Sequence, residues 1–286
     1  MVHVSVIMRS YNDAWVIGET LRALCDQRRR DFELINVDSG STDGTWEIIK
    51  QFNDTPIQIP ASAYNPGRVL NGAIEASRGE TLVFLNSDAT PVGSDWLESL
   101  VAPLAQVDVA ATFGRQIPRE GARLAVRRDY ARAFGNGAPS HRWVHFFSLA
   151  NSAIRREVWE MHRFSEELRY SEDIEWAHWA RKAGFLIRYV PEACVIHSHN
   201  YTLRQTWRRF AGEGEADARI FPWSAWRGSL LRYAVIPYLA DVARDTAYCL
   251  PRGEVLGTLE APIYRAVEKW ARYCGFRKGK AECPSP

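Results

Sequence analysis

Four short polar clusters in this 286-residue chain combine residue types that can do chemistry. The first, Asn86-Ser87-Asp88, directly follows the apolar run Leu82–Leu85 and is followed by Pro91. The run is typical of a strand buried on both faces, and Pro91 prevents a regular continuation. Ligands of open α/β sheets bind beyond the carboxyl ends of the strands, so the Asp88 carboxylate is well placed for chemistry. An Asx-turn explains the same residues equally well.

The second cluster is Ser171-Glu172-Asp173, at the start of a predicted helix. Adjacent carboxylates at this position gain from the positive end of the helix dipole, so a helix cap accounts for them in part. The alternative is that Asp173 or Glu172 is a general base, which takes a proton from an attacking hydroxyl group.

The third cluster, His197-Ser198-His199-Asn200, follows an apolar strand. Histidine is a common metal ligand, and an imidazole with a carboxylate suits a divalent ion that also binds phosphate oxygens. A single histidine would more often be structural. Two histidines within three positions, beyond a strand of the same sheet, make a metal site and a structural role about equally well supported.

The fourth cluster joins Arg9-Ser10-Tyr11-Asn12 to Asp38, at the ends of the first two predicted strands. Its aromatic ring and polar groups could stack on a nucleotide base and accept the base N–H, although ordinary turn chemistry is the alternative. Arg68 could pair with a diphosphate through its bidentate guanidinium group, and a surface salt bridge is the alternative there.

The elements that must position these clusters alternate between strands and helices over the first half of the chain. Predicted strands are Val4–Met8, Phe32–Val37, Ile57–Ile59, Leu82–Leu85, Val109–Gly114, Leu186–Val190 and Cys194–Ile196, with helical patterns between them. This order implies right-handed βαβ units, an α/β fold and a mostly parallel, nucleotide-binding sheet flanked by helices. The motifs GxGxxG and GxxxxGK[ST] are missing, which removes the main support for hydride transfer or a P-loop.

The C-terminal part of the chain differs from the rest. Helical patterns at Leu203–Ala218, Trp226–Cys249 and Glu260–Tyr273, interrupted by prolines including Pro262, predict a helical extension over residues 203–286 after a domain over residues 1–202. The stretch Arg115–Trp143, rich in Arg, Gly and Pro, is either a mobile flap or a surface excursion.

Composition narrows the class of protein. With 46% hydrophobic residues, 24% charged residues and a net charge of +2, the chain can bury a core, and we expect a soluble cytoplasmic protein without a membrane span or signal peptide. Its five scattered cysteines suggest neither disulfides nor a zinc site. From Tyr201 onward there are 14 Lys and Arg against 9 Asp and Glu. This surplus of positive charge, together with Trp207, Trp223, Trp226 and Trp270, suits binding to an anionic surface or substrate. Charged and aromatic residues on ordinary packed helices explain the same composition almost as well.

Together these motifs resemble a known family. The runs Ser5–Asn12, Val37–Thr45, Asn86–Ala89 and Ser171–Asp173 are similar, in order and spacing over about residues 3–200, to family 2 glycosyltransferases with the GT-A fold. The resemblance implies inverting transfer from a nucleotide-diphosphate sugar, usually with Mg²⁺ or Mn²⁺, to a hydroxyl of a glycan or lipid-linked acceptor. The segments His197–Gln205 and Asn86–Pro91 are similar to the rhamnosyltransferase-like branch, which suggests dTDP-rhamnose as the donor and polysaccharide biosynthesis as the setting.

The resemblance also assigns roles to residues of the metal site. Asn86-Ser87-Asp88 takes the place of the metal-binding DxD motif, with Asp88 as the ligand and Asn86 where the first Asp is usual. That difference removes one negative charge. His197 is the preferred third ligand, and His199 is the other candidate.

For the donor and the acceptor the resemblance implies a second set of residues. Asp38 would bind the base or ribose, and Ser39 stands where many members carry a second acid. Asp173 would be the catalytic base, with Glu172 beside it. The residues expected to contact the nucleotide sugar are Arg9, Tyr11, Asp38, Arg68, Asn86 and Ser87.

Two rival functions remain at this point. A sugar-nucleotide-binding module without turnover is compatible with the missing first Asp, whereas a sugar-1-phosphate nucleotidyltransferase would need a Gly-rich basic loop where Arg9–Asn12 stands. No nucleic-acid partner is expected. The C-terminal extension could make peripheral contact with the inner face of a membrane, form a homo-oligomer or close over the acceptor.

Overall fold

The computed structural model describes residues 3–135, 146–221 and 229–282. They form two compact units. The first comprises Met1–Arg119, Ala133–Glu167 and Glu172–Ser198, and the second comprises Glu120–Arg132, Leu168–Ser171 and His199–Pro286. The C-terminal boundary lies between Ser198 and His199, close to the predicted division after residue 202.

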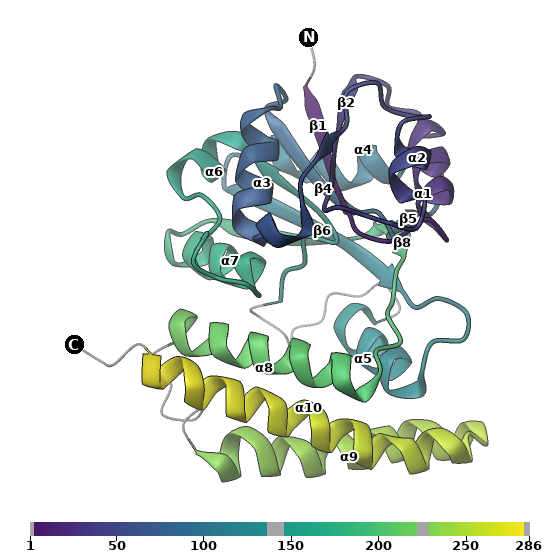
Figure 1. Ribbon diagram of the computed structural model, residues 1–286, viewed down its shortest axis with the longest axis vertical. Coiled ribbons are helices and arrows are strands. Elements are labelled where there is room, and N and C mark those ends of the chain that lie inside the picture. Colours follow the sequence, from purple (N-terminus) through teal and green to yellow (C-terminus); the bar gives the residue numbers. More distant parts are fainter. Residues whose placement is uncertain (1–2, 136–145, 222–228, 283–286) are drawn as a thin grey trace. The chain divides into compact units, whose positions relative to one another are not determined.

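An eight-stranded mixed sheet forms the centre of the first unit (Figure 1), in the order β3-β2-β1-β4-β7-β6-β8-β5. The strands are β1 Val4–Ser10, β2 Phe32–Asp38, β3 Ile57–Gln58, β4 Thr81–Asn86, β5 Thr90–Pro91, β6 Val109–Ile117, β7 Asn151–Arg155 and β8 Leu186–Ile196. Strands β3, β2, β1 and β4 are parallel, as are β6 and β8, whereas β7 runs antiparallel to both β4 and β6 and β5 runs antiparallel to β8. The mostly parallel α/β sheet predicted from the sequence is confirmed.

Helices cover both faces of this sheet. They are α1 Ile17–Cys25, α2 Thr45–Ile49, α3 Pro66–Glu75, α4 Trp96–Val101, α6 Arg156–Met161 and α7 Glu172–Lys182, with 3₁₀ turns at Ala61–Ala63 and Ala102–Ala105. On one face Val83 and Leu85 of β4 pack with apolar residues of α1, α2 and α4. On the other, the ring of Phe84 contacts Phe164, which contacts Trp176 of α7. Side chains of β4 are thus buried on both faces, as its continuous apolar sequence requires.

The pairing register brings the carboxyl ends of five strands to one edge of the sheet. Ser10 of β1 lies opposite Asp38 of β2, and Arg9 lies opposite Asn86 of β4. Because β7 is antiparallel to both of its neighbours, β6 and β8 run in the same direction as β4, and their last residues, Ile117 and Ile196, are paired. The loops after β1, β2, β4, β6 and β8 therefore all leave from this edge.

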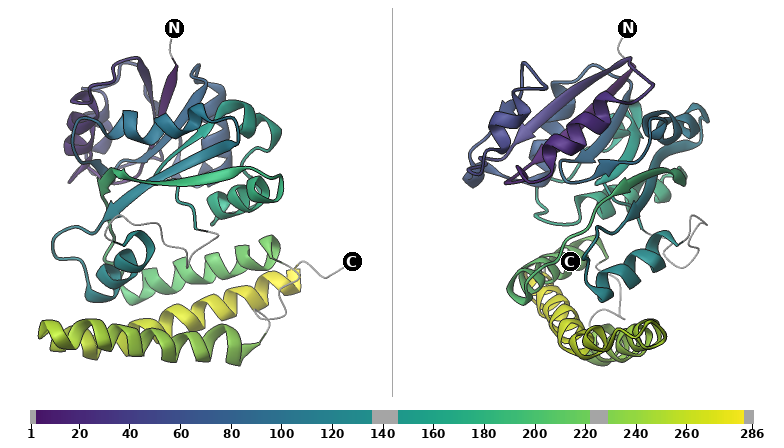
Figure 2. Two further views of the ribbon diagram at one scale, coloured as in Figure 1. Left: turned by 180° about the vertical axis from the view of Figure 1, so that it is seen from behind. Right: turned by 90° about the vertical axis from the view of Figure 1, so that its right-hand side faces the viewer.

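The second unit is helical. It contains residues 124–132 of α5 (Leu124–Phe134), α8 Leu203–Ile220, a π-helical turn at Leu231–Val235, α9 Ile236–Cys249, a 3₁₀ turn at Leu250–Arg252 and α10 Val255–Glu282. Helix α10 packs against both α8 and α9 (Figure 2). A Cβ atom on Gly275 of α10 would lie 1.9 Å from the carbonyl oxygen of Ala211 of α8, so glycine is required at this close approach.

Two sequence predictions for this region differ from the observed elements. Helix α10 begins at Val255 and continues through Pro262, so the predicted break there is wrong. Proline removes one backbone donor from the helix at this position. Of the stretch 115–143, β6 and α5 account for part, and residues 136–145 lie outside the described residues, as do Trp223 and Trp226. Within the described ranges no helix is long and apolar enough to cross a membrane.

Candidate active site

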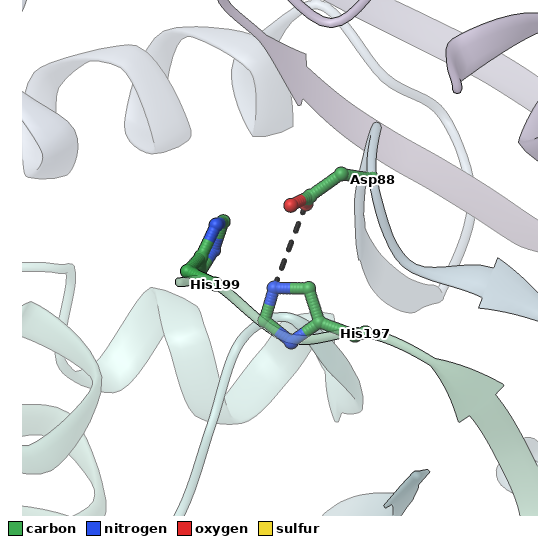
Figure 3. A group of neighbouring side chains, drawn as sticks. All are labelled: Asp88, His197 and His199. Carbon is green, nitrogen blue, oxygen red and sulfur yellow. Dashed lines mark ion pairs between the residues drawn. The ribbon is translucent and has the colours of Figure 1, made fainter. Parts of the chain in front are cut away.

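Asp88 and His197 face each other at the carboxyl edge of the sheet. Asp88 lies in the turn after β4, and His197 directly follows β8. The short strand β5 pairs its Thr90 with Ile196 of β8, which draws the two loops together. Asp88 Oδ1 lies 3.5 Å from His197 Nε2, and the residues are only 4% and 7% exposed (Figure 3).

A glutamine of β6 orients the His197 ring. Nδ1 of His197 lies 2.8 Å from Oε1 of Gln116, and Nε2 of Gln116 donates to the hydroxyl of Ser148 at 3.1 Å. Because the amide group donates to Ser148, its oxygen accepts the Nδ1–H of His197. In the neutral form of the ring, the lone pair is then on Nε2, the nitrogen that faces Asp88.

The Arg119 side chain fastens the two loops to each other. Its Nη2 donates to the carbonyl oxygen of Asp88 at 2.7 Å and to that of Ile196 at 3.4 Å, while its backbone N–H donates to Ser198 Oγ at 3.0 Å. The guanidinium group also lies 4.8 Å from the ring of Trp15, which is 64% exposed. The separation of Asp88 from His197 thus depends on a residue just beyond β6. Sequence reasoning missed Arg119, because the predicted strand ended at Gly114 and Arg119 fell in the stretch Arg115–Trp143, whereas β6 extends to Ile117.

The donor set fits a divalent cation. A carboxylate oxygen and an imidazole nitrogen with its lone pair are ligands that Mn²⁺ and related ions accept. Asp88 and His197 belong to a group of three potential metal ligands whose third member is His199, two residues further along the chain. His199 is the first residue of the second unit, where its ring stacks on that of Tyr201 with centroids 5.0 Å apart.

The other two residues of the Asn86-Ser87-Asp88 motif shape the turn. The backbone N–H of Ala89 donates to the carbonyl oxygen of Asn86 at 2.9 Å, which closes the turn through the main chain. The hydroxyl of Ser87 donates to Asp13 Oδ2 and ties the turn to the loop after β1. The predicted contacts of Asn86 and Ser87 with the nucleotide sugar stay predictions.

Asp173 and Glu172 begin α7 and differ in their electrostatic surroundings. Burial, and then the negative charge of Glu172, raise the pKa of the Asp173 carboxyl from 3.8 to about 7, against the smaller opposing effects of the Ile174 N–H and of Arg9. Glu172 instead makes an ion pair with Arg9, whose Nη1 lies 3.1 Å from Glu172 Oε1. The two adjacent carboxyl groups therefore differ, because burial favours the protonated form of Asp173 whereas Glu172 is paired with a cation.

Asp38 is buried and supports the loop that follows β2. Its carboxylate accepts hydrogen bonds from Ser10 Oγ at 3.2 Å, from the N–H groups of Gly40 and Ser41 at 3.1 and 2.9 Å, and from Gln58 Nε2 at 3.1 Å. These bonds fix the turn, so ordinary turn chemistry is present here. Its predicted contact with the base or ribose stays a prediction.

The remaining nucleotide candidates lie at two places in the first unit. Tyr11, after β1, is 54% exposed. Arg9 is engaged with Glu172, and Arg68 at the start of α3 makes an exposed salt bridge of 3.3 Å with Glu166. The salt-bridge alternative for Arg68 is therefore observed, and its pairing with a diphosphate stays a prediction.

Comparison with known proteins places these features in context. The sequence model of "Glycosyl transferase family 2" matches residues 5–162. The chain is 32% identical to the O-antigen chain rhamnosyltransferase WbaN of Salmonella anatum over 75% of this chain and 72% of that protein. It is 31% identical to the O-antigen chain rhamnosyltransferase RfbN of Salmonella typhimurium over 77% of this chain and 74% of that protein.

Solved structures share the fold. The mannosyltransferase PcManGT of Pyrobaculum calidifontis, in complex with GDP-Man and Mn²⁺, superposes with a TM-score of 0.65 at 20% identity, over 98% of this chain and 87% of that one. TarS residues 1–349 of Staphylococcus aureus superpose with a TM-score of 0.54 at 16% identity, over 98% of this chain and 92% of that one. The GT-A fold expected from the sequence is confirmed.

Proposed function

The chain belongs to glycosyl transferase family 2, and we propose that it transfers rhamnose from dTDP-rhamnose to a hydroxyl group of a glycan or lipid-linked acceptor, with inversion at the anomeric carbon. The observation that carries this proposal lies within the first unit. Asp173, whose carboxyl pKa is raised to about 7, lies in the first turn of α7. Asp88 and His197 form a carboxylate–imidazole pair in the loops after β4 and β8, at the carboxyl edge of the sheet. The identity of about 32% to O-antigen rhamnosyltransferases supports rhamnose as the sugar.

Asp88 and His197 would hold a divalent ion, which supplies positive charge for the diphosphate of the donor. Gln116, whose Oε1 lies 2.8 Å from Nδ1 of His197, orients the ring so that Nε2 would bind the ion. Arg119 fixes the carbonyl oxygen of Asp88 and thereby the position of its side chain. His199, next to His197 in the sequence, is the candidate for a further ligand.

Asp173 would accept the proton of the acceptor hydroxyl. The hydroxyl oxygen forms the new bond to the anomeric carbon from the face opposite the diphosphate, and the bond from that carbon to the diphosphate oxygen breaks with its electron pair. One displacement therefore inverts the anomeric carbon. Glu172 contributes by raising the pKa of Asp173, and Arg9 holds Glu172 in place.

The nucleotide would lie along the ends of β1 and β2. The exposed ring of Tyr11 is available to stack on the base, and Asp38 fixes the loop against which the ribose would rest. Arg68 would contact the diphosphate only after giving up its ion pair with Glu166. Asn86 and Ser87 would line the diphosphate at the carboxyl edge of the sheet. Each of these contacts is a proposal that rests on position at the carboxyl edge.

A donor screen tests this function. Thermal unfolding of the full chain is measured with UDP-, GDP- and dTDP-sugars, with and without Mn²⁺, since a bound ligand raises the melting temperature by mass action. We expect the largest shift with dTDP-rhamnose plus Mn²⁺, followed by dTDP release when acceptor is added. A shift with no dTDP release for any acceptor would favour a binding module without turnover, and a preference for a UDP- or GDP-sugar would contradict the donor.

A further inference from the structure

The second unit buries charges that helices usually expose. Arg265 of α10 is 1% exposed, and its guanidinium group contacts Asp245 of α9 at 2.8 Å and Glu268 at 2.6 Å. It also contacts Asp129 of α5 at 2.8 Å. In the same interior, Arg128 of α5 forms an ion pair with Asp241 of α9, and both residues are less than 10% exposed. Buried ion pairs of this kind hold α5, α9 and α10 in register, because removing one partner would leave an uncompensated charge.

The outer side of α10 is apolar. Leu256, Leu259, Ile263 and Trp270 are 77%, 65%, 60% and 49% exposed. Their spacing of three, four and seven positions places them on one stripe of the helix, and the buried Ala261, Arg265 and Glu268 lie on a different side. The usual distribution of an amphipathic helix is thus reversed at these positions, although α10 also buries the apolar Ala271 and Phe276 and exposes Glu260 beside Leu256 and Ile263.

Helix α9 repeats the reversal. Ile236 and Leu239 are 50% and 59% exposed, and Ala243 continues the same stripe, whereas Asp241 and Asp245 face the interior. At the turn to α10, Leu250 and Val255 are 59% and 62% exposed. Because α9 and α10 are neighbours in this unit (Figure 1), the exposed residues belong to adjacent helices. We define the apolar face as the exposed stripe of α9, Ile236 and Leu239, together with that of α10, Leu256, Leu259, Ile263 and Trp270.

The exposed charges of the helical segments that carry the apolar face favour an anionic partner. In the described part of residues 229–282, the exposed charged residues are the six cations Arg232, Arg244, Arg252, Arg277, Lys278 and Lys280 and the two anions Glu260 and Glu282. The guanidinium group of Arg252, at the turn, lies 3.9 Å from the ring of Tyr248. A second copy of this chain would bring like charges together, whereas anionic lipid headgroups complement them while the acyl region receives the apolar side chains.

We propose that the apolar face of α9 and α10 docks on the surface of an anionic phospholipid bilayer, with the helices in the plane of the interface. The exposed apolar side chains enter the boundary between headgroups and acyl chains, and Trp270 and the arginines lie at the level of the headgroups. This proposal is independent of the donor and of the sugar transferred. Docking here would hold the full chain at a surface where lipid-linked acceptors are found.

Vesicle flotation of the full chain tests the docking. The probes are vesicles of phosphatidylglycerol with phosphatidylcholine, and vesicles of phosphatidylcholine alone. The variant Leu259→Gln with Ile263→Gln removes two members of the apolar face, and Arg252→Gln with Arg277→Gln removes two cations. The matched control is Val107→Gln, since Val107 is an apolar residue of the first unit that is 79% exposed. Circular dichroism and thermal unfolding confirm that each variant is folded.

The wild type and the control should float with the anionic vesicles and much less with phosphatidylcholine. Each apolar residue lost should weaken binding by about tenfold, and each arginine lost by about fivefold at low salt. Folded Leu259→Gln/Ile263→Gln protein that binds as the wild type would overturn the proposal, as would absence of wild-type binding to anionic vesicles. A lipid-free dimer of the wild type that the same double variant abolishes would assign the face to a second copy instead.

Discussion

Replacing Asp173 with Asn should abolish transfer and at the same time stabilise the fold. Burial and the charge of Glu172 raise the pKa of Asp173 from 3.8 to about 7, so a negative charge is unfavourable at this place in the folded chain. One pKa unit corresponds to about 1.4 kcal/mol, and the shift of roughly three units places an upper bound of about 4 kcal/mol on the stability lost when Asp173 ionises. Asparagine keeps the shape of the side chain and avoids this loss.

The dependence on pH has a definite sign. Because the folded pKa of Asp173 is raised, its contribution to stability is fully present below pH 3.8 and is lost as the pH rises through about 7. The stability advantage of Asp173→Asn should therefore grow between these two pH values and then level off. Transfer by the wild type should show the opposite trend, rising about tenfold per pH unit below about pH 7, because only the ionised carboxylate accepts a proton.

Urea unfolding and initial rates of transfer, measured over the same pH range, test both effects. Glu175→Gln is the matched control, since it makes the same change on the same helix at a carboxylate that pairs with His162; it should keep transfer. Glu172→Gln should move the midpoint of the rate profile to lower pH, because it removes a negative charge next to Asp173. Near-normal transfer by folded Asp173→Asn, or a wild-type rate that is flat through pH 7, would refute the assignment of the base.

Three further predictions concern the metal site and the second unit. Asp88→Asn should weaken Mn²⁺ binding, measured by calorimetry without any donor sugar, by more than about tenfold; unchanged affinity would exclude Asp88 as a ligand. Arg119→Met should lower the Mn²⁺ affinity by about 10- to 100-fold with no change in circular dichroism, because the carbonyl oxygen of Asp88 loses its donor; an unaffected affinity would show that Arg119 does not position the site. Gly275→Ala should destabilise the fold by about 1–3 kcal/mol in urea unfolding, because its Cβ would collide with Ala211. Gly72→Ala, with nothing within 4 Å of its new Cβ, should instead stabilise the fold slightly. Equal changes in unfolding free energy for Gly275→Ala and Gly72→Ala would contradict the packing of α8 on α10.

Sequence alone could predict much of the fold and where the candidate site lies. Apolar runs that end in polar residues, such as Leu82–Leu85 before Asp88, identified buried strands and their carboxyl ends. The parallel register then brought Asp88 and His197 to one edge, as expected. The prediction succeeded because the direction of each strand and the position of the loop after it follow from the local hydrophobic pattern and from the order of the strands and helices.

Long-range partners could not be predicted in this way. The ion pair of Arg9 with Glu172 joins residues 163 positions apart, and the bond of Gln116 to His197 depends on the register between β6 and β8. Periodicity also shows that a helix has an apolar stripe without showing which way the stripe faces. For α10 only the structure reveals that Leu259 is outside and Arg265 inside.

The most direct test of the proposed function compares the anomeric configuration of donor and product. Transfer from dTDP-rhamnose to an acceptor is followed by nuclear magnetic resonance, which reports the configuration at the anomeric carbon of the new glycosidic bond. A single displacement assisted by Asp173 predicts a product of configuration opposite to that of the donor. A product with the donor's own configuration would contradict the mechanism, because one displacement from the face opposite the diphosphate always inverts the anomeric carbon.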